Sequence, residues 1–94
     1  MSQATLDQVR AVLVEQFGVD EIEVVLEAVI ETDLGADEID NVNLIFALEE
    51  AFDIVIPDTE FDQAKTVAGL VEMIERRVAA AEEARKMPVW KKGA

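Results

Sequence analysis

One stretch decides the fold: Leu34-Gly35-Ala36-Asp37-Glu38-Ile39-Asp40-Asn41-Val42-Asn43-Leu44-Ile45-Phe46-Ala47-Leu48-Glu49-Glu50. After a glycine turn, Asp37 is placed to act as an N-cap, and Asp40, three residues later, completes a capping box. Glu38 adds a third negative charge beside the positive end of the helix dipole. The apolar residues of this predicted helix are too many for one narrow stripe. Such a helix is either buried on most sides or keeps apolar surface for a partner.

This stretch resembles the signature of acyl carrier proteins, which is Leu-Gly-Ala-Asp-Ser-Leu-Asp, then a helix, then Ile-Pro-Asp. The matching residues are Leu34, Gly35, Ala36, Asp37 and Asp40, with Ile39 in place of leucine and Ile56, Pro57 and Asp58 after the helix. The register runs without a gap from about Gly18 to Ile74. One departure changes the chemistry: Glu38 stands where the family has the serine that receives 4′-phosphopantetheine.

The hydrophobic spacing predicts an all-α bundle of three long helices and one short helix, the architecture that the resemblance also implies. The first long helix is expected from about Thr5, capped by Thr5 and Gln8, to Phe17, with Gly18 as its left-handed stop. A long loop over residues 19–36, with at most one short helix, leads to the second long helix, Glu38 to Phe52. Residues 59–64 form the short helix, anchored by Phe61, and Thr66 caps the last helix, which runs to about Lys86.

Two details of this bundle are also predicted. Val25, Leu26 and Val29 lie at positions that are usually polar in the family, and we expect them to seal the long loop onto the bundle; the alternative is an apolar patch for a partner. In the last helix, we expect Met73 or Val78 to be partly exposed. The resemblance further implies an apolar interior that can sheathe an acyl chain.

Composition excludes several classes of protein. The 94 residues make one small domain, and the chain has no cysteine, no histidine and a single serine, Ser2. Disulfides, thiolate chemistry, histidine-dependent zinc sites and serine or cysteine hydrolases are therefore excluded, and no catalytic residue is predicted. No apolar run is long enough to span a membrane, and the N-terminus lacks a signal pattern, so a cytoplasmic location is expected.

Charge is unevenly distributed along the chain, whose net charge is −13. Residues 1–64 hold 17 acids and one base, a balance of −16, whereas residues 65–94 hold four acids and seven bases, a balance of +3. The acidic part should repel nucleic acid and attract basic patches on protein partners; the simpler interpretation is that it only keeps the protein soluble. We expect a monomer or a weak dimer. No metal site is predicted, because the acids near Asp37 lack the glycine that a calcium loop needs at its sixth position.

Glu38 determines the functional interpretation, because a carrier protein needs an alcohol at this position to form the phosphodiester with the pantetheine arm. We consider three explanations in order. The chain is a carrier-fold paralogue that has lost the arm and works by binding partners; or it is an ordinary carrier whose serine was changed by engineering; or another residue is modified. Glu38 is interpreted either as a mimic of the phosphate charge or as a well-tolerated residue in the first turn.

The family resemblance implies that the second long helix docks on basic, partly apolar patches of acyl-chain synthases and transferases, in fatty-acid, polyketide or related synthesis. The alternative is that its acids are simply a solvated face. The predicted partner-binding residues are Asp37, Glu38, Asp40, Val42, Asn43, Phe46, Ala47, Glu49 and Glu50. Asn43 stands where family members often have an acid. A structural or dimerising role for the last helix and the tail is a further alternative.

The C-terminal segment, residues 87–94, is predicted to be a basic tail outside the helical domain, residues 1–86. It follows a helix-stopping proline and holds the only tryptophan, Trp90, and two lysines, Lys91 and Lys92. This composition is typical of a disordered tail. The alternative hypothesis is that Trp90 docks on an apolar surface while the lysines meet acidic groups, in this molecule or in another.

Overall fold

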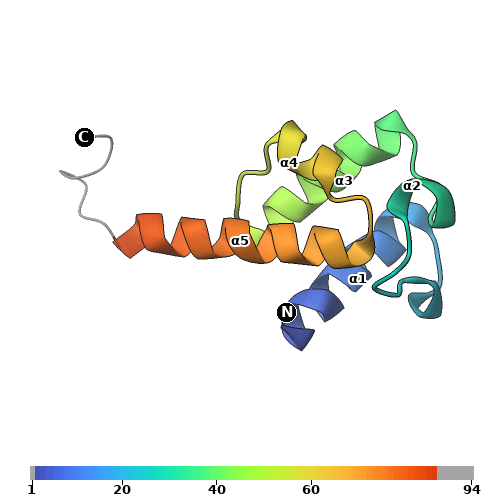
Figure 1. Ribbon diagram of the computed structural model, residues 1–94, viewed down its shortest axis with the longest axis horizontal. Coiled ribbons are helices and arrows are strands. Elements are labelled where there is room, and N and C mark those ends of the chain that lie inside the picture. The colour runs from blue at the N-terminus through green and yellow to red at the C-terminus, as the bar shows by residue number, and fades with distance from the viewer. Residues whose placement is uncertain (1, 87–94) are drawn as a thin grey trace.

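The computed structural model describes residues 2–86, which form an all-α fold as predicted (Figure 1). The helices are α1 (Gln3–Phe17), α2 (Ile30–Asp33), α3 (Glu38–Phe52), α4 (Asp58–Gln63) and α5 (Val67–Lys86), and the 3₁₀ turn η1 spans Glu21–Glu23. No described residue belongs to a β-strand. α1 packs against α3 and α5, and α4 packs against α5. The three long helices and the short α4 confirm the predicted bundle. The long loop holds two short helical segments, η1 and α2, where at most one was expected.

Helix α1 starts earlier than predicted and without the predicted cap. Its N-cap position is Ser2, which has extended backbone angles (φ −88°, ψ 135°) and no capping side-chain hydrogen bond. Thr5 therefore lies inside the helix, and the capping box expected from Thr5 and Gln8 is wrong. The stop is as predicted: Gly18 takes a left-handed conformation (φ 66°), and its N–H donates to the carbonyl of Val14 at 2.9 Å.

The core lies between the three long helices. Leu6, Val9 and Leu13 of α1 pack toward Leu44 and Leu48 of α3, and α5 contributes the largest set of buried side chains, Val67, Leu70, Val71, Met73 and Ile74. Met73 is fully buried and Val78 is half-buried, so the prediction that Met73 or Val78 is partly exposed is confirmed at Val78. Met73 is buried because both α1 and α4 pack against α5, which widens the buried arc of this helix beyond one stripe.

The long loop before α2 is fixed to the beginning of α5 by backbone hydrogen bonds. The N–H groups of Val67 and Ala68 donate to the carbonyls of Ala28 and Leu26, each at 3.0 Å, and an isolated antiparallel bridge joins Val29 to Thr66. Leu26 and Val29 are half-buried, which agrees with the predicted sealing of the loop. Val25 is exposed, so the prediction fails for that residue.

The second half of the chain follows the predicted plan closely. Phe61 of α4 is buried, and the Thr66 hydroxyl accepts a hydrogen bond from the N–H of Gly69 at 3.1 Å, which confirms it as the cap of α5. In Figure 1 the C-terminal half of α5 extends beyond the other helices. None of the described helices is both long and apolar enough to cross a membrane. The predicted tail and its Trp90 lie outside the described residues.

Candidate functional site

The beginning of α3 is held by the capping box that the sequence predicts. The Oδ1 atom of Asp37 accepts from the N–H of Asp40 at 2.8 Å, and the Oδ2 atom of Asp40 accepts from the N–H of Asp37 at 3.3 Å. The preceding turn is anchored because Leu34 and Ala36 are buried, while Gly35 between them takes a left-handed conformation (φ 74°). These contacts fix the position at which Glu38, the first helical residue, projects from the fold.

One side of α3 carries exposed apolar residues. Ile39, Val42 and Phe46 are 72%, 51% and 63% exposed. Their i, i+3, i+7 spacing places them in one line on the helix surface. Exposed polar residues flank this line, and together they form what we call the α3 face: Glu38, Ile39, Val42, Asn43, Phe46 and Glu50. Three exposed large apolar side chains on one helix form the kind of patch that marks an interaction site.

The predicted partner-binding residues other than Glu49 divide into two groups in the structure. Glu38, Val42, Asn43, Phe46 and Glu50 lie on the α3 face, whereas Asp37 and Asp40 make the capping box and Ala47 is half-buried. The sequence analysis did not select Ile39, because it stands in place of a leucine of the family signature. Its position three residues before Val42 and seven before Phe46 was the available signal.

Glu49 has a structural contact that the sequence analysis also missed. Its Oε2 atom accepts a hydrogen bond from the N–H of Ile56 at 2.9 Å, in a partly buried setting. This bond connects α3 to the loop that returns toward α4, and Ile56 itself is buried. The carboxylate of Glu49 is therefore already engaged within the domain, in contrast to that of Glu50, which is exposed on the same helix.

We expect Glu49→Ala to lower the free energy of unfolding by about 1–3 kcal/mol, because the N–H of Ile56 would lose its acceptor in a partly buried position. The matched control is Glu50→Ala on the exposed side of the same helix, for which a change within about 0.5 kcal/mol is expected. Urea unfolding of the two variants and the unchanged protein gives both values. Equal effects of the two substitutions would contradict the assigned role.

The acids of the α3 face are not neutralised by bases of the domain. In the described part of the chain the ion pairs are Arg10 with Asp7, Arg77 with Glu60 and Arg85 with Asp53, and none of them uses an acid of α3. Nor do three or more acids within residues 2–86 come together in a group that could hold a metal ion. The α3 face thus combines apolar side chains with uncompensated negative charge.

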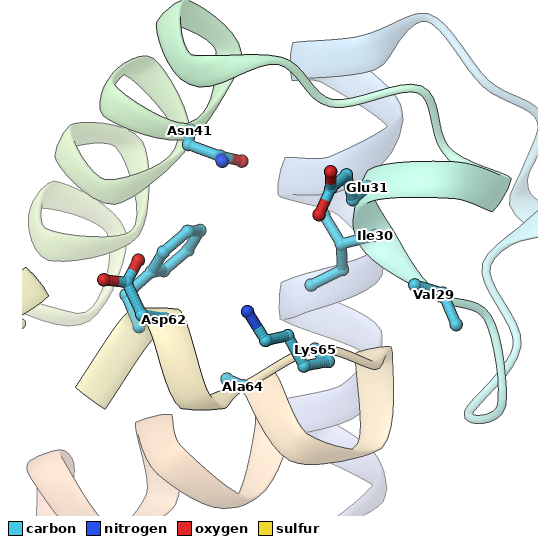
Figure 2. Close-up of a pocket in the computed structure, with 8 residues that line it drawn as sticks. Val29, Ile30, Glu31, Asn41, Asp62, Ala64 and Lys65 are labelled. Carbon is cyan, nitrogen blue, oxygen red and sulfur yellow. The ribbon is translucent and has the colours of Figure 1, made fainter. Parts of the chain in front are cut away.

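A small cavity lies on the inner side of α3, between α2 and α4. In Figure 2, Asn41 approaches it from α3, Glu31 and Ile30 from α2, and Lys65 from the segment that follows α4. Its volume is about 50 Å³, which is room for a few water molecules. The other lining residues are Val29, Phe61, Asp62 and Ala64.

Comparison with known proteins places this fold in a family. A family model described as "Phosphopantetheine attachment site" matches residues 7–74, which span most of α1, the long loop, α3, α4 and the first part of α5. The chain belongs to the acyl carrier protein family. It is 45% identical over 75 residues to an acyl carrier protein of Thermosynechococcus vestitus, covering 80% of this chain and 93% of the relative. It is 48% identical over 73 residues to one of Campylobacter curvus, covering 78% and 95%.

Acyl carrier proteins are carriers and not enzymes, and family membership thereby supports the prediction that this chain has no catalytic activity of its own. Proteins of this family carry a phosphopantetheine prosthetic group and interact with synthases and transferases. The cavity on the inner side of α3 is too small to hold a long acyl chain without rearrangement of the helices around it.

The beginning of α3 does not offer what attachment of this prosthetic group requires. A phosphodiester forms on an alcohol, and residues 37–41 are Asp, Glu, Ile, Asp and Asn. Of the hydroxyl side chains elsewhere, that of Thr66 is hydrogen-bonded to the N–H of Gly69, and Thr32 and Thr59 lie on α2 and α4. The residues at the start of α3 therefore do not fit a covalently attached pantetheine arm.

Proposed function

We propose that this domain is an acyl-carrier-like interaction module that is not phosphopantetheinylated at the usual position. Glu38 occupies the place of the attachment serine, and the domain acts by binding basic partner enzymes through the α3 face. The partners we propose are synthases or transferases of fatty-acid, polyketide or related synthesis, in the cytoplasm. The single observation that carries this proposal is the exposed Glu38 as first residue of α3, with no alcohol in the same turn.

The structural setting of Glu38 supports this function. The capping box uses Asp37 and Asp40, and within the described chain the Glu38 carboxylate makes no hydrogen bond or ion pair. Glu38 is therefore not needed to hold the helix, beyond its favourable charge near the positive end of the dipole. Its negative charge lies at the place that the phosphate of the arm would occupy, so it maintains part of the charge pattern that a partner of a loaded carrier meets.

The chemistry of the α3 face indicates the kind of partner. Phe46 lies at the centre of the exposed arc, and aromatic side chains dominate the binding free energy of many interfaces. Glu38 and Glu50 flank the apolar line with negative charge, so a complementary surface has an apolar pocket bordered by lysine or arginine. The net charge of −13 adds attraction toward such a surface over a longer range, which raises the association rate at low salt.

The test is incubation with coenzyme A and a broad-specificity phosphopantetheinyl transferase, read by intact-protein mass. We expect the present protein to keep its mass, because a carboxylate does not form the phosphodiester, and Glu38→Ser to gain one phosphopantetheine group. Circular dichroism of both proteins serves as the control for folding. This pair of variants differs only in the side chain on which the proposal depends.

The other outcomes separate the remaining hypotheses. Loading of the present protein would overturn the proposal and show that another residue is modified. Loading of Glu38→Ser alone fits both a natural paralogue and an ordinary carrier with an engineered change, which the gene sequence from the source organism separates. Failure of both proteins to load, with both folded, would favour a structural or dimerising role.

A further inference from the structure

A shallow groove lies between the C-terminal half of α5 and the loop that follows α3. It is lined by Val55, Arg77, Ala80, Ala81 and Ala84, and its volume is about 240 Å³. Val55 is 70% exposed, so its side chain leaves apolar surface open at the edge of the groove. The groove is separate from the α3 face, because none of its lining residues belongs to α3.

Two arginines hold the walls of this groove in place. The Nε atom of Arg77 donates to the carbonyl of Val55 at 2.9 Å, and its Nη1 atom pairs with Glu60 at 3.0 Å. Closer to the end of α5, Arg85 pairs with the carboxylate of Asp53 at 2.7 Å. The loop and the helix are thus connected at Val55 itself and at Asp53, two residues earlier. The groove is preformed, and the charges of both arginines are already paired.

We infer that this groove is the docking site of the C-terminal segment of the same chain, residues 87–94, with Trp90 seated against Val55 and the alanines of α5. Trp90 is the only tryptophan, and it comes four residues after Lys86, where the described helix ends. Pro88 disfavours continuation of the helix, as a turn of the segment back toward the groove would require.

The length of the segment fits this assignment. Ala81 lies five residues before Lys86, about 7.5 Å back along the helix axis. The four residues from Lys86 to Trp90 reach up to about 13 Å when extended, which leaves enough chain for a reversal of direction. An indole ring has the apolar area to cover Val55 and the alanine side chains, and its N–H can remain at the edge of the groove in contact with water.

Size and charge favour this occupant over a second copy of the protein. The groove has five lining residues, whereas a stable interface between proteins uses about 20–30 residues on each side. Two copies would also bring together net charges of −13 each. A segment already attached to the end of α5 needs no large interface, because its effective concentration at the groove is of the order of millimolar. Its two lysines are also not repelled by the acidic domain.

The chain contains no tyrosine, so its fluorescence reports on Trp90 without interference. We expect the emission of the full-length protein to be blue-shifted relative to a synthetic peptide of residues 86–94, at every protein concentration tested. Val55→Lys should remove most of this shift and raise acrylamide quenching to the level of the peptide. Because Val55 is exposed, this substitution should leave the fold intact, which circular dichroism verifies.

The matched control is Ile22→Lys, which introduces the same charge at a residue that is 84% exposed on η1. It should leave the emission of Trp90 unchanged. An emission equal to that of the peptide in the unmodified protein would overturn the inference, as would equal responses to the two lysine substitutions. A blue shift that grows with protein concentration would overturn it in favour of a second copy. None of these outcomes depends on whether Glu38→Ser is loaded.

Discussion

Phe46→Glu, made in the Glu38→Ser protein, is expected to lower the rate of phosphopantetheine transfer by about thirtyfold or more. Phe46 lies at the centre of the α3 face, and loss of a central aromatic anchor from an interface costs about 2 kcal/mol or more, which corresponds to this factor. A basic partner surface does not repel the added carboxylate, so the expected loss of rate is assigned to the lost apolar contact of Phe46. The transferase serves here as a partner whose activity requires docking close to residue 38.

The control for this prediction is Ile22→Glu in the same Glu38→Ser background. Ile22 is 84% exposed on η1, outside α3, so the substitution makes the same change of charge and also removes an exposed apolar side chain, at a remote place. Initial rates at several transferase concentrations, measured by intact mass, show whether the loss lies in docking. Equal rates for the two double variants would remove the α3 face from the proposed interface.

Leu48→Ala is expected to lower the free energy of unfolding by about 2–5 kcal/mol, a large share of the 5–15 kcal/mol that is typical of a domain. Leu48 is fully buried on the opposite side of α3 from Phe46, and its removal leaves a cavity in the core. Urea unfolding, followed by circular dichroism at ~222 nm, would show the loss as a lower urea concentration at the midpoint, with little change in the slope of the unfolding free energy against urea concentration.

Phe46→Ala is the counterpart on the same helix. Its side chain is 63% exposed, so we expect a change in stability of less than about 1 kcal/mol. The two substitutions together separate the roles of the two sides of α3. A large loss of stability for Phe46→Ala would mean that this side chain packs within the domain and is not held for a partner.

The local elements of the fold were predictable because their signals are local. Asp37 and Asp40 form the predicted capping box, α3 has the predicted bounds, and Gly18 ends α1 in the left-handed conformation. Each of these features depends on residues within one helical turn of one another. The error at Thr5 has the same origin: a capping-box pattern occurs there, but Ser2 precedes it, and the backbone becomes helical at Gln3.

Features that depend on contacts between distant segments were not predictable in the same way. Glu49 looks like any other acid of α3 until the loop folds back and presents the N–H of Ile56 to it. The burial of Met73 depends on how α1 and α4 flank α5, which the spacing of residues in α5 alone does not contain. For the site, the sequence identified Glu38, Val42 and Phe46 and predicted the capping box of Asp37 and Asp40. Only the structure distinguishes Glu49, which is bonded within the domain, from the exposed Glu50.

The hydrogen bonds between the long loop and α5 have a consequence for local opening of the domain. The first N–H groups of a helix have no acceptor within it, and here the carbonyls of Ala28 and Leu26 accept from Val67 and Ala68. These two amides can exchange with deuterium only when the loop has separated from the helix. Their exchange rates therefore measure how often the segment from Leu26 to Ala28 separates from the first turn of α5.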